Sequence, residues 1–279
     1  MMRIWYGGKL PEGPLPIQAT DRGLTLGDGI FETLLVRDGI ALWRFEHLQR
    51  MENAAQIMGL PFNGDDIENA MDGLCHGTTG SHTLRLTLSR GAGLRGLADD
   101  GKSPTFYATL VPFDEALQFQ PVSLLTSSIT RNEKSLSSRL KTLSYVDNIL
   151  AAREAVAKGY DDALMLNTKG RVACSTIGNV FLWVEDRLVT PSLAEGVLPG
   201  IMRHAVLQAA KSSGIKASEK RVTKADLARA SRLFVTNSLR ILRPVSRLDD
   251  RKFSQKRHAG ENAIIAQIAH LMMEQLVLS

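Results

Sequence analysis

The stretch PFDEALQFQP, from Pro112 to Pro121, constrains the architecture of this chain most strongly. It has a proline at each end and interrupts the strand-like and helical patterns on either side, as loop segments do. A chain of 279 residues is long enough for two compact domains. We therefore predict an N-terminal α/β domain over 1–112, an interdomain linker over 113–121 and a C-terminal domain over 122–279.

Both domains are predicted to mix strands and helices. Apolar and β-branched runs predict strands over 3–6, 30–36, 40–43, 83–88, 106–111, 122–125, 163–166, 179–183, 188–189 and 232–236. Asp38-Gly39, between the second and third of these runs, indicates a hairpin. Apolar residues at helical spacing predict helices over 45–58, 145–158, 200–212, 224–229 and 260–277. This mixture indicates an α/β or α+β fold.

Composition and charge exclude several classes of protein. The net charge is +5, but the basic residues are scattered and form no nucleic-acid-binding motif. There is no run of eighteen apolar residues, and the N-terminus lacks the features of a signal peptide. The two cysteines, Cys75 and Cys174, form neither a disulfide framework nor a metal-binding set. We expect a cytoplasmic protein without a metal ion, a membrane span or a nucleic-acid partner.

Lys141 is a candidate nucleophile. It lies in SRLKTLSYVDNILAA, just before a predicted helix whose residues are mostly apolar or small. A lysine becomes nucleophilic only where burial or a neighbouring cation lowers its pKa. Because most lysines at a helix start are simply exposed, the interpretation depends on the residues that accompany Lys141.

Three segments have the groups that a phosphate-bearing cofactor needs. In GVLPGIMRHAVLQAA, a turn at Pro199-Gly200 precedes a helix whose first amides belong to Ile201 and Met202. Such helix N-termini bind phosphate, and hydroxyl groups and a fixed cation add to the binding. The segment 236–238 offers the hydroxyls, and Arg50 offers the cation.

Seven segments in order along the chain resemble the class IV (fold type IV) enzymes that depend on pyridoxal 5′-phosphate (PLP). This family includes branched-chain aminotransferases, D-amino acid aminotransferases and aminodeoxychorismate lyases. The resembling segments are DRGLTLGDGIFET (21–33), FEHLQRM (45–51), SRGAGLRG (89–96), KTLSYVDNILA (141–151), GRVACSTIGNVFL (170–182), GVLPGIMR (196–203) and TNSLRILRPV (236–245). The resemblance implies a two-domain α/β (α+β) fold, PLP bound between the domains, and a homodimer.

The resemblance also implies roles for individual residues. Lys141 matches the lysine that forms the Schiff base with PLP and carries the proton. The residues matching phosphate contacts are Arg50, Ile201, Met202, Ser238 and Leu239. Arg95 matches a substrate-carboxylate arginine, and Phe31 and Tyr145 match residues that line the substrate pocket.

Cys174 departs from the family pattern. The family usually has a glutamate five residues before the Asn of NVF (here Asn179), where it pairs with the protonated pyridine nitrogen of PLP. A carboxylate there keeps the ring cationic, whereas a neutral thiol stabilises that charge much less. A thiolate would substitute in part, but only if the pKa of Cys174 were strongly lowered.

Three functions follow from these observations. The leading hypothesis is an aminotransferase of the branched-chain type, which moves the amino group of a small, apolar amino acid to a 2-oxoacid. The apolar Phe31 and Leu97 favour it over the D-amino acid branch, which typically has tyrosine and histidine there. TNSLRILRPV instead resembles the aminodeoxychorismate lyases, which release pyruvate and 4-aminobenzoate in folate synthesis. Cys174 supports the third alternative, a non-catalytic PLP-binding protein.

Overall fold

The computed structural model describes residues 2–11, 13–98, 101, 103–254, 256 and 258–277. The chain forms two compact units, each of which has its own sheet. The first unit comprises Met1–Glu115, Leu140–Ser144 and Gln275–Ser279, and the second comprises Ala116–Arg139 and Tyr145–Glu274. The chain passes from the first unit to the second within the segment 113–121, and a short later segment returns to the first unit.

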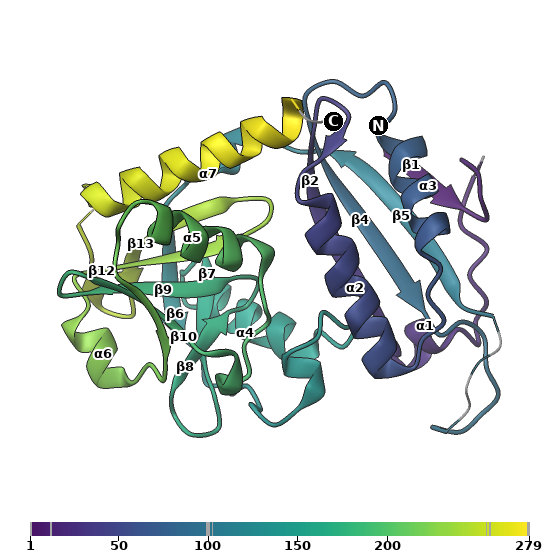
Figure 1. Ribbon diagram of the computed structural model, residues 1–279. Helices are drawn as coiled ribbons and strands as arrows, with labels where there is room; N and C mark the ends of the chain where they lie inside the picture. The colour runs from purple at the N-terminus through teal and green to yellow at the C-terminus, as the bar shows by residue number, and fades with distance from the viewer. Residues whose placement is uncertain are drawn as a thin grey trace. The chain divides into compact units, whose positions relative to one another are not determined.

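The first unit is built on an antiparallel five-stranded sheet with the strand order β1-β5-β4-β2-β3. Its strands are β1 (Arg3–Tyr6), β2 (Gly29–Arg37), β3 (Ile40–Ala41), β4 (Ser81–Ser89) and β5 (Thr105–Pro112). Its helices are α1 (Arg22–Leu26), α2 (Arg44–Met58) and α3 (Gly64–Cys75). Helices α2 and α3 lie on the same face of this sheet (Figure 1).

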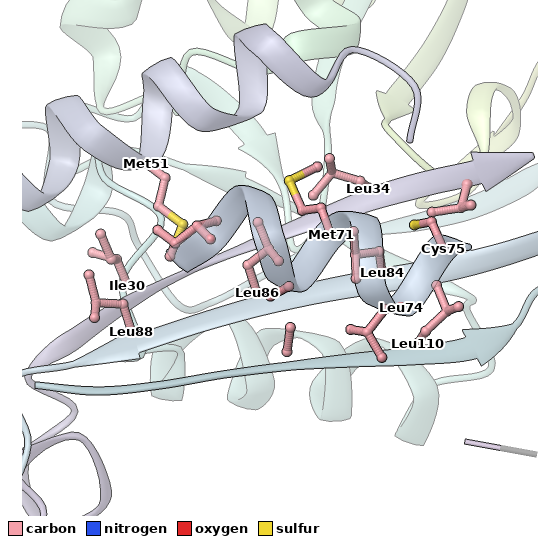
Figure 2. Packing of buried hydrophobic residues seen from close by; sticks show 14 of the residues in the cluster. Ile30, Leu34, Met51, Met71, Leu74, Cys75, Leu84, Leu86, Leu88 and Leu110 are labelled. Atoms are coloured by element: carbon pink, nitrogen blue, oxygen red, sulfur yellow. The ribbon is translucent and has the colours of Figure 1, made fainter. Parts of the chain in front are cut away.

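Alternation along β2 and β4 supplies the core of the first unit. Side chains two residues apart lie on one face of a strand, so Ile30 and Leu34 of β2 point toward the helices. They pack with leucines of β4 and β5 against Met51 of α2 and Met71 of α3 (Figure 2). Helix α2 ends at Gly59, whose left-handed φ of 61° suits glycine.

Residues 141–143 join the first unit through an isolated β-bridge to β2. The amide of Phe31 donates to the carbonyl oxygen of Lys141 at 2.9 Å, and the amide of Leu143 donates to that of Gly29 at 2.9 Å. Ile30 and Thr142 form an antiparallel bridge between these two bonds. Lys141 is therefore held beside the beginning of β2, although 110 positions of sequence (141 − 31) separate it from Phe31.

The second unit contains a nine-stranded sheet that closes on itself. Its strands are β6 (Val122–Thr126), β7 (Asp162–Leu166), β8 (Val172–Ser175), β9 (Asn179–Val184), β10 (Arg187–Pro191), β11 (Ala217–Lys220), β12 (Arg232–Asn237), β13 (Ile241–Leu248) and β14 (Arg251–Lys252). The order is β11-β10-β9-β12-β13-β6-β7-β8, and a further β8–β9 pairing closes the barrel. Three pairings, β10–β11, β13–β6 and β6–β7, are parallel.

Four α-helices accompany this barrel. They are α4 (Val146–Ala157), α5 (Ile201–Ser212), α6 (Lys224–Arg229) and α7 (Ala259–Val277), the last of which enters the first unit at Gln275. Short 3₁₀ turns occur at Glu115–Leu117, Leu136–Ser138 and Leu193–Glu195. Helix α5 begins directly after the turn at Pro199-Gly200.

The fold confirms the α+β interpretation and most of the predicted elements. The strands predicted at 3–6, 30–36 and 83–88 are β1, β2 and β4, and the helices predicted at 45–58 and 224–229 are α2 and α6. The run 40–43 is strand only over β3, because Trp43 adopts a left-handed φ of 53° before α2. The elements that were not predicted are helices α1 and α3 and strands β8, β11, β13 and β14.

We predict that Leu86→Ala lowers the free energy of unfolding of the first unit by about 2–5 kcal/mol, because it removes a fully buried side chain and leaves a cavity. Leu24→Ala, at an exposed position of α1, is the control and should change stability by less than about 0.5 kcal/mol. Urea unfolding measures both changes. Equal effects of the two substitutions would contradict the packing described for this core.

Candidate active site

Lys141 lies against the ring of Phe31. Its Nζ is 4.2 Å from the ring centroid, and the backbone pairing of 141–143 with β2 holds the two residues together. The guanidinium of Arg85 on β4 is also 3.8 Å from the same centroid. Two cations thus contact one buried aromatic ring.

Arg50 lies on α2 and forms a bidentate ion pair with Glu32 of β2. Its Nε donates to Glu32 Oε1 at 2.7 Å, and its Nη2 donates to Oε2 at 2.6 Å. His47, one turn earlier on α2, places Nδ1 2.7 Å from the same Oε2. Sequence analysis identified Arg50 but missed Glu32, which is 1% exposed within a strand of otherwise apolar pattern.

The protonation of this cluster follows from its burial and charges. Burial is the largest single effect on Glu32 and opposes its ionisation, but the charges and hydrogen bonds of Arg50 and His47 together outweigh it and hold the pKa of this carboxyl well below its usual range. Burial lowers the pKa of His47, although Glu32 partly offsets that shift. Glu32 is therefore ionised and accepts hydrogen bonds only, so a neutral His47 donates its Nδ1–H to it.

In the second unit, the N-terminus of α5 is close to the ends of three strands. Asn179 begins β9, pairs with Cys174 of β8 and Thr236 of β12, and donates its Nδ2 to the carbonyl of Leu198 at 3.0 Å. A side chain at Gly200 would overlap Oδ1 of Asn179, so only glycine permits this approach.

The residues around Asn179 fit a phosphate group. Among the described residues, no side chain caps α5, so the amides of Ile201 and Met202 lie at an uncapped positive end of the helix. The hydroxyls of Ser175 and Thr236 are buried and have no hydrogen-bond partner within the described part of the chain. Unsatisfied buried hydroxyls are costly, and an anion that accepts from them removes that cost. Ser175 was missed from the sequence.

The other predicted residues have different environments. The amide of Leu239 donates to Asn237 Oδ1 at 3.1 Å, so Leu239 belongs to a turn that also contains Ser238. Tyr145 is half-buried at the residue that precedes α4. Arg95 is exposed in the loop that follows β4, in the first unit. Of the predicted residues, the first unit brings together Phe31 and Lys141.

Cys174 lies in β8 within a small apolar cluster that includes Ala151, Ala163 and Val197. Burial raises the pKa of its thiol; Arg131 opposes this shift and Asp162 adds to it. The guanidinium of Arg131 also donates to backbone carbonyls of Gly196 and Ser138 at 2.8 and 2.7 Å. Cys174 is therefore a neutral thiol, and the thiolate alternative considered from the sequence is not supported.

The described residues contain no group of three or more His, Cys, Asp or Glu side chains that could hold a metal ion. None of the described helices combines the length and the apolar character needed to cross a membrane.

The first unit has a lysine beside β2 of its sheet, and the second has an uncapped helix near the ends of its barrel strands. These features define a class of two-unit α+β protein that fits a phosphate-bearing cofactor. The chain matches amino-transferase class IV over residues 29–248, which covers most of its length. This chain belongs to the class IV aminotransferase family.

Named relatives represent more than one branch of this family. The chain is 30% identical over 272 residues to a branched-chain-amino-acid aminotransferase of Pseudomonas aeruginosa, with 91% of this chain and 87% of the relative covered. It is 28% identical over 272 residues to an aminodeoxychorismate lyase of Bacillus subtilis, with 94% and 92% covered.

A solved structure resembles the whole chain. A hypothetical aminotransferase of Mycobacterium tuberculosis in its PLP-bound form superposes with a TM-score of 0.87 at 25% identity, covering 98% of this chain and 99% of that one. Class IV aminotransferases use PLP, so the chain is a PLP-dependent enzyme of fold type IV.

We predict that Cys174 stays protonated at neutral pH, because burial raises its pKa above the usual value of 9.0. Thiolate absorbance in the ultraviolet, measured during a pH titration, tests this prediction. The variant Cys75→Ser leaves Cys174 as the one cysteine of the sequence, so the titration then reports on Cys174 alone. In the wild type, Cys75 is also buried, and its pKa is raised to about 11. A thiolate signal at neutral pH that Cys174→Ser removes would contradict the neutral thiol.

Proposed function

We propose that the chain is an aminotransferase that holds PLP as a Schiff base on Lys141. Arg50, the amides of Ile201 and Met202, and the segment Ser238-Leu239 would hold the phosphate. The family match covers these residues, and the segments that contain them resemble those of the family. Ser175 and Thr236 join the proposed phosphate site, because their buried hydroxyls have no partner among the described residues. The PLP-binding domain that we propose has the limits predicted from the sequence, residues 122–279.

The observation that carries the proposal is the environment of Lys141. Its Nζ contacts a buried aromatic ring that a second cation, Arg85, also contacts. The backbone pairing with β2 and the ring of Phe31 hold the amine in one place, and a lysine amine in a fixed position is the group that forms a Schiff base with a carbonyl carbon. A lysine that simply entered a helix would be exposed instead.

The proposed roles follow from this arrangement. PLP, when bound, supplies an electron sink for the carbanion formed by loss of the substrate α-proton. Lys141 Nζ, freed when the substrate amine takes its place on the cofactor, would accept that proton and later give it back. Phe31 and Tyr145 border the substrate, and Arg95 binds its carboxylate. The phosphate contacts fix the cofactor, so that Nζ acts on one bound geometry.

The proposed substrates are a small, apolar amino acid and a 2-oxoacid. The apolar Phe31 suits an apolar side chain, and the similarity to a branched-chain aminotransferase supports that class. A second candidate is aminodeoxychorismate lyase activity, which the similar identity to a named lyase and the lyase-like segment 236–245 both favour. We also propose a cytoplasmic homodimer, which light scattering after size-exclusion chromatography would test.

We predict that PLP gives a visible absorbance band with the wild-type protein and none with Lys141→Ala, because only the wild type has the amine that condenses with the aldehyde. The substitution should also lower kcat by about 10²–10⁴-fold, through loss of the proton carrier. If Lys141→Ala kept the band, another residue would hold PLP and the proposal would be wrong.

Product analysis with the same protein separates the candidate functions. A 2-oxoacid formed from an amino acid indicates the aminotransferase, and pyruvate with 4-aminobenzoate formed from aminodeoxychorismate indicates the lyase. A visible band with neither product would favour the non-catalytic alternative that Cys174 suggests.

We predict that Cys174→Glu accelerates the half-reaction with an L-amino acid by about tenfold or more. A carboxylate close to the pyridine nitrogen raises the pKa of that nitrogen by about 1–3 units and strengthens the electron sink. Cys174→Ser, which stays neutral and small, is the matched control and should remain near the wild-type rate. Stopped-flow absorbance measures the half-reaction. A folded, PLP-loaded Cys174→Glu that is no faster than the control would show that Cys174 does not face the ring nitrogen.

A further inference from the structure

Glu32 is a buried carboxylate with no role so far in the proposed reaction. It lies on the same face of β2 as Ile30 and Leu34, which pack in the core between the sheet and α2. Its neighbours along the strand are therefore apolar, and its two oxygen atoms face α2.

The geometry of the Glu32–Arg50 pair restricts the guanidinium. The carboxylate accepts from both Nε and Nη2, which form one edge of a planar group. Fixing one edge of a planar fork fixes the directions of all its donors. His47 in turn bonds Oε2 of Glu32 at 2.7 Å, so the carboxylate is itself held from a second side.

Stability alone does not account for this arrangement. The desolvation of two charges offsets much of their attraction, and well-packed apolar side chains of similar size often stabilise a core as well or better. The leucine-rich surroundings would accept such side chains. An ion pair, unlike apolar packing, holds a charged group in a fixed direction.

We propose that Glu32 is a positioning residue that holds the Arg50 guanidinium in the orientation that binds the phosphate of PLP, with His47 holding Glu32. This inference rests on the proposed function, which makes Arg50 a phosphate ligand. Glu32 itself touches neither substrate nor cofactor in this proposal.

Charge and orientation act in opposite directions here, and the test must separate them. The negative charge of Glu32 opposes an anion nearby, so removing that charge would itself favour phosphate. Glu32→Asp keeps the charge and shortens the side chain by one methylene group. The shorter carboxylate cannot reach both nitrogens from the same backbone position, so this variant changes orientation alone.

The experiment compares the Kd of PLP with that of pyridoxal, which lacks the phosphate. The ratio of the two Kd values measures what the phosphate contributes to binding. We expect Glu32→Asp to weaken PLP by about 10–100-fold, the usual effect of losing an outer partner of a ligand group, and to leave pyridoxal nearly unchanged.

Glu261→Asp is the matched control. Glu261 is an equally buried carboxylate that accepts from an arginine, Arg232, at 2.8 Å in the second unit. The same chemical change there should lower stability and leave the ratio of Kd values at its wild-type value.

Two substitutions at His47 give a second test if Glu32→Asp does not fold. His47→Leu removes the donor to Glu32 without changing the charge of a neutral imidazole, and should also reduce the phosphate contribution. His47→Asn keeps a nitrogen donor at a similar reach and should restore it. Equal ratios in these two variants and the wild type would overturn the proposal.

Arg50→Ala distinguishes failure of this inference from failure of the proposed function. If Arg50→Ala leaves the ratio unchanged, Arg50 is not the phosphate ligand, and both proposals fail. If Arg50→Ala lowers the phosphate contribution but Glu32→Asp does not, the proposed ligand stands and the positioning role of Glu32 is wrong. Equal weakening of PLP and pyridoxal by Glu32→Asp would also overturn that role.

Discussion

The antiparallel pairing of residues 141–143 with the first residues of β2 is the constraint on which the candidate site of the first unit depends. Two backbone hydrogen bonds of 2.9 Å hold Lys141 beside Phe31, and no local turn would do so. The side chains on the two faces of strand β2 also make different contacts. Phe31 meets the cations on one face, while Glu32 binds Arg50 on the face that α2 covers. One strand therefore positions both the proposed nucleophile and the proposed phosphate-binding cation.

Much of the fold was predictable, because its strands and helices have strong local patterns. The Asp38-Gly39 turn between two apolar runs indicated the hairpin, and Gly59 indicated the end of α2. Helix α3 was missed although Asn63 caps it and Ile67, Ala70, Met71 and Leu74 form its apolar face. Its glycines and clustered acids weaken the helical pattern, whereas Asn63 followed by Asp66 was a usable start signal. Strand β13 was missed because Pro244 and two arginines interrupt it.

The candidate site was predictable only in part, because its geometry is non-local. Lys141, Arg50 and the α5 turn were identified from family segments, but the packing of 140–144 in the first unit depends on a pairing across more than a hundred residues. Glu32 gave no local signal, since a single acid in an apolar strand has no distinctive spacing. His47 and Arg50, three residues apart on one helix face, were the available hint that α2 meets a buried anion. Ser175 was hidden for a similar reason, because only the folded structure shows that its hydroxyl has no partner among the described residues.

The two units differ in the kinds of group that they offer to a charged cofactor. The environment of Cys174 illustrates this difference. The first unit concentrates charge, with Arg50 on the buried carboxylate of Glu32 and with Arg85 and Lys141 on the ring of Phe31. The second offers helix amides and hydroxyls, which in our proposal bind the phosphate by dipoles and hydrogen bonds. A glutamate in place of Cys174 would add a buried anion to a cluster of small apolar residues, where burial opposes ionisation. A neutral thiol avoids that cost, and the chemistry then depends more heavily on how firmly the phosphate and Lys141 hold the cofactor in place.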